Sequence, residues 1–204
     1  MLFLLVSFPL VSQITVPAFD DKYSNSIKKL ENGLTDIDYA DFRDSFIESE
    51  QFIKASAQGK QFDSLRTAMY KAMKDKNYPT VIAITQNMLS IDYTSMLAHK
   101  ILRQTYKIVG DTVKAKQYKD IQFGLLRSII SSGDGKTCAT GWHVIQIEEE
   151  YFILDVMEAD LEEQSVDYTG GLCDRMDVKE EGKKKTYYFD VTKVFEGYKK
   201  LGME

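Results

Sequence analysis

The sequence predicts an α+β protein in which antiparallel, tetratricopeptide-like helical hairpins pack on a C-terminal four-stranded antiparallel sheet. Apolar residues recur every three or four positions up to about residue 130, and further along they alternate or form short β-branched and aromatic blocks. A glycine-rich stretch, Ser131–Thr137, separates the two patterns. The chain has 204 residues, of which 44% are hydrophobic and 28% charged, so it can bury one core of ordinary domain size.

Residues 1–13 are expected to form a leader rather than a part of the fold. Almost every side chain from Met1 to Val11 is apolar, and Ser12-Gln13 follows. This pattern is similar to the apolar segment and cleavage site of a secretory signal, although no Lys or Arg precedes it. We therefore expect export to the periplasm or the cell surface. The alternative is an apolar N-terminal strand.

The helical half is predicted to span residues 14–132. Its apolar periodicity and turn residues indicate helices at about residues 23–30, 35–52, 62–76, 79–89, 96–109 and 112–129. Thr35 and Asp111 are suitable N-caps, and Pro79 fits the first turn of its helix. Asn32-Gly33 ends the first helix, and the polar segment 56–60 is expected to be a loop.

Two of the helix joints repeat each other. Lys76–Tyr78 and Val109–Asp111 occupy the same place between paired helices about one repeat apart, as in tetratricopeptide packing. About one and a half repeats are visible, whereas a free-standing solenoid needs at least three. We therefore expect the helices to bury their apolar faces against the sheet.

The sheet half is predicted to span residues 133–204. Alternating and β-branched segments indicate strands at about residues 142–147, 151–157, 173–179 and 186–191, with a short C-terminal helix near 195–201. Glu148–Glu150 is expected to form a tight charged connection between the first two strands. The stretch 158–169 is less regular, and Gly182 suits the tip of a second hairpin over residues 179–185.

The two cysteines, Cys138 and Cys173, have two possible states. In an exported protein they can form a disulfide bond. They can also be buried free thiols, which is a common environment for cysteine. The sequence does not give the distance between their Cα atoms, which decides between the two states.

Composition excludes two classes of function. A net charge of −5 and a pI near 5.2 argue against nucleic-acid binding, because a phosphate backbone needs a basic surface. No apolar run reaches the length of about eighteen residues that a membrane-spanning helix needs. We therefore expect no nucleic acid as a partner and no transmembrane segment.

Motif spacing indicates no cofactor and no metal. Gly133–Thr137 is similar to the end of a phosphate-binding loop, but Ile130 stands where that loop needs a glycine, and the helix precedes the strand. Asp134 and its neighbouring serines offer too few oxygen ligands for calcium. His99 has no second histidine at the spacing of a metal site.

His143 is the strongest candidate for chemistry. As a general base it would need a carboxylate that orients its second ring nitrogen, and Glu149 or Glu150 lies close in sequence. The alternative is a partly buried histidine that is bonded to a carbonyl or hydroxyl group. Because exposed aromatic side chains are common in recognition surfaces, a binding surface near the glycine-rich joint is expected to include Asp134, Trp142, His143 and Tyr151.

Several blocks of the chain carry a resemblance to a known family. They are Ile129–Lys136, Val144-Ile145, Glu149–Tyr151, Tyr187–Asp190 and, earlier, Leu34-Thr35 and Asp38-Tyr39. In these blocks the chain resembles the bacterial domain-of-unknown-function family 4919, although Thr140–Trp142 stands where the family tends toward an alanine-phenylalanine pair. The resemblance implies a tetratricopeptide-like helical half, a C-terminal sheet and export, and it implies no reaction.

We expect a non-enzymatic module that binds a protein or peptide in a groove between the helices and the sheet. Repeat-like helices and many aromatic residues favour this function, and no complete catalytic set is evident. Two alternatives stay open. One is a small hydrolase that uses His143 with Glu149 or Glu150, and the other is a structural subunit of an envelope assembly. Capture of a partner would favour the first hypothesis, and loss of an activity in His143→Ala would favour the hydrolase.

Overall fold

The computed structural model describes residues 14–203, so the predicted leader over residues 1–13 lies outside the described part. That part contains nine α-helices, one 3₁₀ turn and four strands. In chain order these are α1 (Lys22–Glu31), α2 (Tyr39–Glu48), α3 (Glu50–Ala57), α4 (Gly59–Lys74), α5 (Tyr78–Ile91), α6 (Met96–Ile108), α7 (Thr112–Ile130), η1 (Cys138–Thr140), β1 (Trp142–His143), α8 (Ile147–Val156), β2 (Ala159–Asp167), β3 (Cys173–Glu180), β4 (Lys183–Asp190) and α9 (Thr192–Lys200). The α+β class is confirmed.

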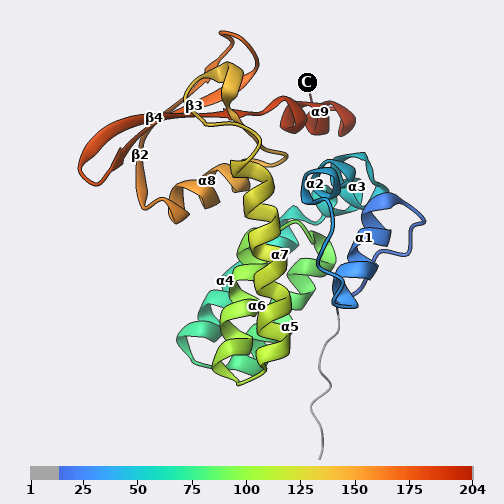
Figure 1. The fold of residues 1–204 in the computed structure, drawn as a ribbon. Helices are drawn as coiled ribbons and strands as arrows, with labels where there is room; N and C mark the ends of the chain where they lie inside the picture. The colour runs from blue at the N-terminus through green and yellow to red at the C-terminus, as the bar shows by residue number, and fades with distance from the viewer. Residues whose placement is uncertain (1–13, 204) are drawn as a thin grey trace, which may run out of the picture.

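Helices α4 to α7 form successive hairpins, each helix packing on the next (Figure 1). The turn between α4 and α5 contains Lys76 at a φ of 54°, and the turn between α6 and α7 contains Gly110 at a φ of 84°. Asn77 and Asp111 cap the helices that follow, since each side chain accepts a hydrogen bond from a first-turn N–H. The predicted positions of these four helices and their turns are confirmed.

The helix predicted over residues 35–52 is in fact two helices. Asp38, and not Thr35, is the N-cap of α2, because its Oδ1 accepts from the N–H of Asp41 at 3.0 Å. Ser49 then ends α2 in an extended conformation and begins α3, with its Oγ accepting from the N–H of Phe52 at 3.2 Å. A serine hydroxyl that competes for backbone groups is the physical reason for the break.

The loop expected over residues 56–60 is reduced to one residue. Helix α3 continues to Ala57 and α4 begins at Gly59, so only Gln58 separates them. Gly59 is exposed, and no atom lies within 4 Å of the place where a Cβ would stand. This joint is therefore open to solvent.

The sheet has the strand order β1-β4-β3-β2 and is mixed, which corrects the prediction of an antiparallel sheet. Strands β2, β3 and β4 form two antiparallel pairs. Strand β1 pairs in parallel with β4, with Trp142 opposite Phe189 and His143 opposite Asp190. No hairpin turn joins β1 to β4, because α8, β2 and β3 lie between them in the chain, and this long connection permits parallel pairing.

One of the predicted strands is wrong, and another is shorter than predicted. The segment predicted as a strand over residues 151–157 belongs to α8, and the expected connection Glu148–Glu150 forms the first turn of that helix. The strand predicted over 142–147 shortens to two residues, and the less regular stretch 158–169 contains β2. Acidic residues stabilise the first turn of a helix, and a short apolar run fits a buried helix as well as a strand.

The second hairpin and the C-terminal helix are confirmed. Strands β3 and β4 pair from Cys173 opposite Asp190 to Glu180 opposite Lys183. The tip between them places Gly182 at a φ of 76°, the left-handed conformation that tight hairpin turns require. Helix α9 follows β4 directly and contacts α2.

A disulfide bond joins Cys138 in η1 to Cys173 at the start of β3, with 5.6 Å between the two Cα atoms. The paired state is therefore the correct alternative of the two. The bond is consistent with an oxidising, extracytoplasmic location. Within residues 14–203, no helix combines the length and the apolar character needed to span a membrane.

Candidate functional site

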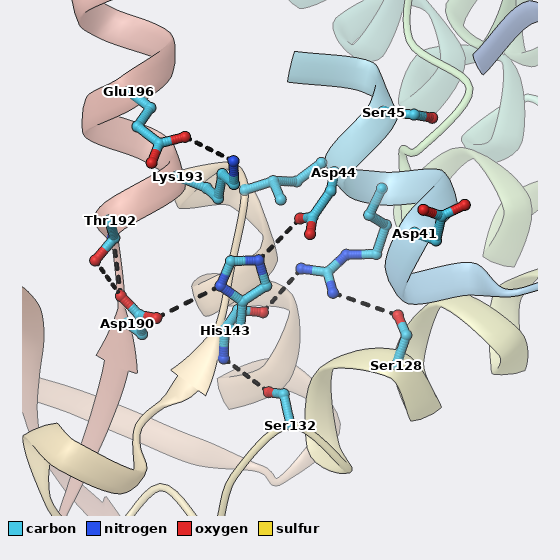
Figure 2. Close-up of polar contacts among 12 residues, drawn as sticks. Asp41, Asp44, Ser45, Ser128, Ser132, His143, Asp190, Thr192, Lys193 and Glu196 are labelled. Carbon is cyan, nitrogen blue, oxygen red and sulfur yellow. Dashed lines mark hydrogen bonds and ion pairs between the residues drawn. The ribbon is translucent and has the colours of Figure 1, made fainter. Parts of the chain in front are cut away.

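His143 lies at the end of β1 with both ring nitrogens facing carboxylates (Figure 2). Its Nε2 lies 2.9 Å from Oδ1 of Asp44 in α2, and its Nδ1 lies 3.5 Å from Oδ2 of Asp190 at the end of β4. Its backbone N–H donates to Oγ of Ser132, just after α7, at 2.8 Å. The residue therefore links α2, the end of α7 and the sheet.

The charges around His143 favour its protonated form. The hydrogen bond with Asp44 raises the pKa of the imidazole, burial and the charge of Arg43 act against this increase, and the charges of Asp44 and Asp190 add to it. Burial alone would raise the pKa of Asp44, but the contact with His143 and the charge of Arg43 lower it. An imidazole held between two carboxylates in this way stabilises the fold as an ion pair.

Arg43 is completely buried and holds Glu149 in a two-point ion pair. Its Nε donates to Oε1 of Glu149 at 2.8 Å, and its Nη2 donates to Oε2 at 2.6 Å. The guanidinium also donates to the carbonyl oxygen of His143 at 2.9 Å and to Oγ of Ser128 at 3.3 Å. Oε2 of Glu149 accepts from the N–H of Ile145 at 2.8 Å. This network fixes α8 against α2 and α7.

The structure does not bring His143 together with Glu149 or Glu150 as a base and its orienting carboxylate. Asp44 takes that place from the helical half, which sequence proximity could not indicate. A signal for Arg43 was available, since it lies on the inward stripe of its helix, and a buried arginine requires a carboxylate partner.

Glu150 is a second buried carboxyl group, in surroundings quite different from those of Glu149. Burial, and then the charges of Asp174 and Glu149, raise its pKa to about 9. Glu150 is therefore protonated at neutral pH, and the charge of Asp174 acts on its carboxyl group. Oδ2 of Asp174 accepts from the side-chain amide of Gln164 at 2.7 Å, and Tyr151 donates to that amide's oxygen at 2.8 Å. Hydrogen bonds thus connect Asp174 to the exposed Tyr151.

A groove of about 870 Å³ lies between α3 and α4, the joint of α5 with α6, and α8. Aromatic side chains line it from both sides. Phe52, Phe62 and Tyr70 come from α3 and α4, and Tyr151 and Phe152 come from α8. The side chains of Tyr70 and Tyr151 are 50% and 46% exposed, so they are available to a bound molecule.

The joint between α5 and α6 contributes a buried carboxylate, Asp92, to the groove. Its Oδ1 accepts from the N–H of Thr94 at 2.8 Å and from the hydroxyl of Thr94 at 2.6 Å, and its Oδ2 accepts from Nε2 of Gln146 at 3.1 Å. Burial raises the pKa of Asp92 to about 6, these hydrogen bonds act against the increase, and the nearby charge of Glu148 adds to it.

The other charged side chains of the groove are largely paired. Asp63 forms an ion pair with Arg66 at 2.7 Å, and Asp155 forms one with Lys100 at 2.8 Å. Among the described residues, no ion pair involves Asp92 or the exposed Glu148. The groove therefore combines aromatic walls with uncompensated negative charge.

Of the four residues predicted for a binding surface, only Tyr151 lines this groove. Trp142 is buried, and the carboxylate of Asp134 accepts from Thr140 at 2.6 Å within its own turn. His143 faces the two carboxylates described above. Sequence reasoning did not assign Asp92 or Phe62 to a binding surface, because nothing local shows that α8 lies opposite α4. No group of three or more His, Cys, Asp or Glu side chains within residues 14–203 is arranged to hold a metal ion.

Comparison with known proteins identifies a family. The family described as "Domain of unknown function (DUF4919)" matches residues 20–200. Neither the curated proteins nor the solved structures include a match to the chain. The description of the family names no reaction and no ligand.

Proposed function

We propose that this chain, which belongs to the DUF4919 family, is a non-enzymatic module of the cell envelope that holds a protein or peptide segment in the groove between α4 and α8. The observation that carries the proposal is the groove itself. Its volume of about 870 Å³ suits several side chains, and exposed tyrosines stand on both of its sides.

The surroundings of the groove support a binding role. Helix α4 packs along α5, and the Arg43–Glu149 ion pair holds α8 against α2, so contacts within the chain position both walls. Tetratricopeptide-like pairing of α4 to α7 is part of this proposal, as is location in the periplasm or at the cell surface. The disulfide between Cys138 and Cys173 agrees with such a location.

The hydrolase alternative receives less support from the geometry. Both ring nitrogens of His143 face carboxylates, and both oxygens of Glu149 accept hydrogen bonds from Arg43. Neither group is free to act on a substrate in this arrangement. An activity found in a substrate screen and lost in His143→Ala would restore the hydrolase hypothesis.

Cross-linking of the tagged chain in its native cell envelope, followed by mass spectrometry, tests the proposal. We expect a stoichiometric partner with the native chain and none with Gly59→Trp, which adds a large side chain at a residue that lines the groove and where a Cβ would meet no atom within 4 Å. Val113→Trp is the matched control, because Val113 is 77% exposed on α7 and does not line the groove.

Either of two outcomes would contradict the proposal. One is the same set of captured proteins with the native chain and with Gly59→Trp. The other is capture of nothing but further copies of the chain, which would support the structural-subunit alternative instead. Equal melting temperatures of the two tryptophan variants would show that neither has lost its fold.

A further inference from the structure

Asp92 holds a negative charge in the wall of the groove without a compensating cation. The residue is 8% exposed, and its three hydrogen-bond donors, two from Thr94 and one from Gln146, are all neutral groups. Neutral donors fix the direction of a carboxylate but do not cancel its charge, and a buried uncompensated charge is costly. A ligand with a positive charge would relieve that cost.

Glu148 extends this negative charge to the surface. It is exposed in the first turn of α8 and lines the groove together with Asp92. Its charge raises the pKa of Asp92, and both residues line the same groove. Like charges repel, and a cation placed between them would interact favourably with both.

One ammonium group of the chain already lies in the groove. Lys100 pairs with Asp155 at 2.8 Å, and its Nζ lies 5.6 Å from the centroid of the Phe152 ring. A carboxylate and an aromatic face together are a favourable environment for a cation. Asp92 and Glu148, beside the same aromatic wall, provide the carboxylates of a second such place.

The extent of the groove indicates a peptide rather than a small amine. Its lining runs from Phe62 and Tyr70 on α4 to Tyr151 on α8, and the apolar side chains Met96 and Leu97 lie between. One ammonium group would contact the carboxylates and leave these apolar surfaces exposed. A chain segment with apolar side chains on both sides of a cation would cover them.

We infer that the groove binds an extended peptide segment in which a Lys or Arg side chain lies against Asp92 and Glu148 and the flanking apolar side chains pack on the aromatic walls. This inference rests on the proposed function, because it names the ligand class of the same groove. It adds a requirement for charge that the proposed function does not contain.

Selection from a phage library of short random peptides against the full-length chain tests the inference. Phage that bind the Gly59→Trp variant are removed first, so that the remaining peptides are specific for the groove. We expect these peptides to share a Lys or Arg between apolar residues. For one enriched peptide, replacement of that cation by norleucine should weaken binding roughly tenfold or more, the scale of a hydrogen bond to a charged group.

Matched variants connect the effect to the two carboxylates. Glu148→Gln should weaken binding of the cationic peptide and leave binding of its norleucine analogue unchanged. Asp92→Asn should do the same, and its melting temperature shows whether the fold is retained. Glu163→Gln, which changes the charge equally at an exposed position of β2, should have no effect on either peptide.

The two proposals fail in different ways. Enrichment of neutral or acidic peptides, or equal affinities of the cationic peptide for the native chain and Glu148→Gln, would overturn the inference and leave the proposed function standing. Failure to enrich any peptide over the Gly59→Trp variant would count against both.

Discussion

Replacement of Glu150 by glutamine should make the stability of the protein less dependent on pH. The glutamate is fully buried beside Asp174 and has a pKa of about 9 in the folded chain, against 4.5 when it is unfolded and hydrated. Between these values the folded state holds a proton that the unfolded state has released. The free energy of unfolding therefore falls as the pH rises from 4.5 to 9, because the unfolded state binds fewer protons.

The magnitude follows from the difference between the two pKa values. Each unit of pKa difference corresponds to about 1.4 kcal/mol, so the full effect is about 6 kcal/mol and the part between pH 5 and pH 7.5 is about 3 kcal/mol. Glutamine has a similar shape, remains neutral throughout, and can donate its amide N–H to Asp174. We therefore expect Glu150→Gln to lose this part of the pH dependence and to be more stable than the native chain at pH 7.5.

Urea unfolding at several pH values measures the effect as the difference between the native chain and the variant. The raised pKa of His143 also contributes to the free energy of unfolding. This contribution is fully present below about pH 6.5 and is lost as the pH rises through the pKa of His143 in the folded state. This contribution is common to both proteins and cancels in the difference. Glu163→Gln, at an exposed position, should follow the native curve. A difference between Glu150→Gln and the native chain that stays constant from pH 5 to 7.5 would refute the reasoning.

Three further substitutions test the framework that holds the groove. Arg43→Ala leaves Glu149 buried without its cation and should lower the free energy of unfolding by about 3–5 kcal/mol, which denaturant titration measures; a loss under about 1 kcal/mol would contradict the role given to this pair. Cys138→Ser opens a loop with a sequence separation of 35 and should cost about 4 kcal/mol, a loss that reductant should reproduce in the native chain but not in the variant. Gly135→Val introduces a Cβ at a φ of 66° and 2.8 Å from the Trp142 ring, and should destabilise by more than about 1 kcal/mol, whereas an unchanged melting temperature would show that this turn tolerates a side chain.

The helical half was predictable because its signals are local. Asn77 and Asp111 cap helices through side chains that bond within three residues, and Gly110 supplies the left-handed conformation at the joint before α7. Ser49 is also a local capping residue, because its hydroxyl caps α3. Its position within a continuous apolar period concealed the break between α2 and α3. Apolar periodicity alone does not show where one helix ends when the same periodicity continues into the next helix.

The order of strands near the joint was not predictable in the same way. Parallel pairing of β1 with β4 depends on residues that lie about fifty positions apart in the chain, Trp142 with Phe189. Strand β2 is exposed along most of its length, so it lacks the alternation of buried and exposed residues that identifies a strand with one packed face. Its conformation is specified by pairing with β3 and by little in its own sequence.

The candidate site depends on one choice between helix and strand at residues 147–156. In a strand, Glu148 and Glu150 would share one face of the sheet and Glu149 would lie on the other face. In a helix each step turns by about 100°, so three successive glutamates meet three different surroundings. Glu148 faces the groove, Glu149 the Arg43 guanidinium, and Glu150 the carboxyl group of Asp174. The same helical turn thus supplies the wall of the groove, the ion pair that holds this wall in place, and the proton-dependent contact with the sheet. Glu150 lies in the same helical turn as Glu148 but does not line the groove. Glu150→Gln therefore tests how protonation stabilises this wall of the groove and leaves the groove surface itself unaltered.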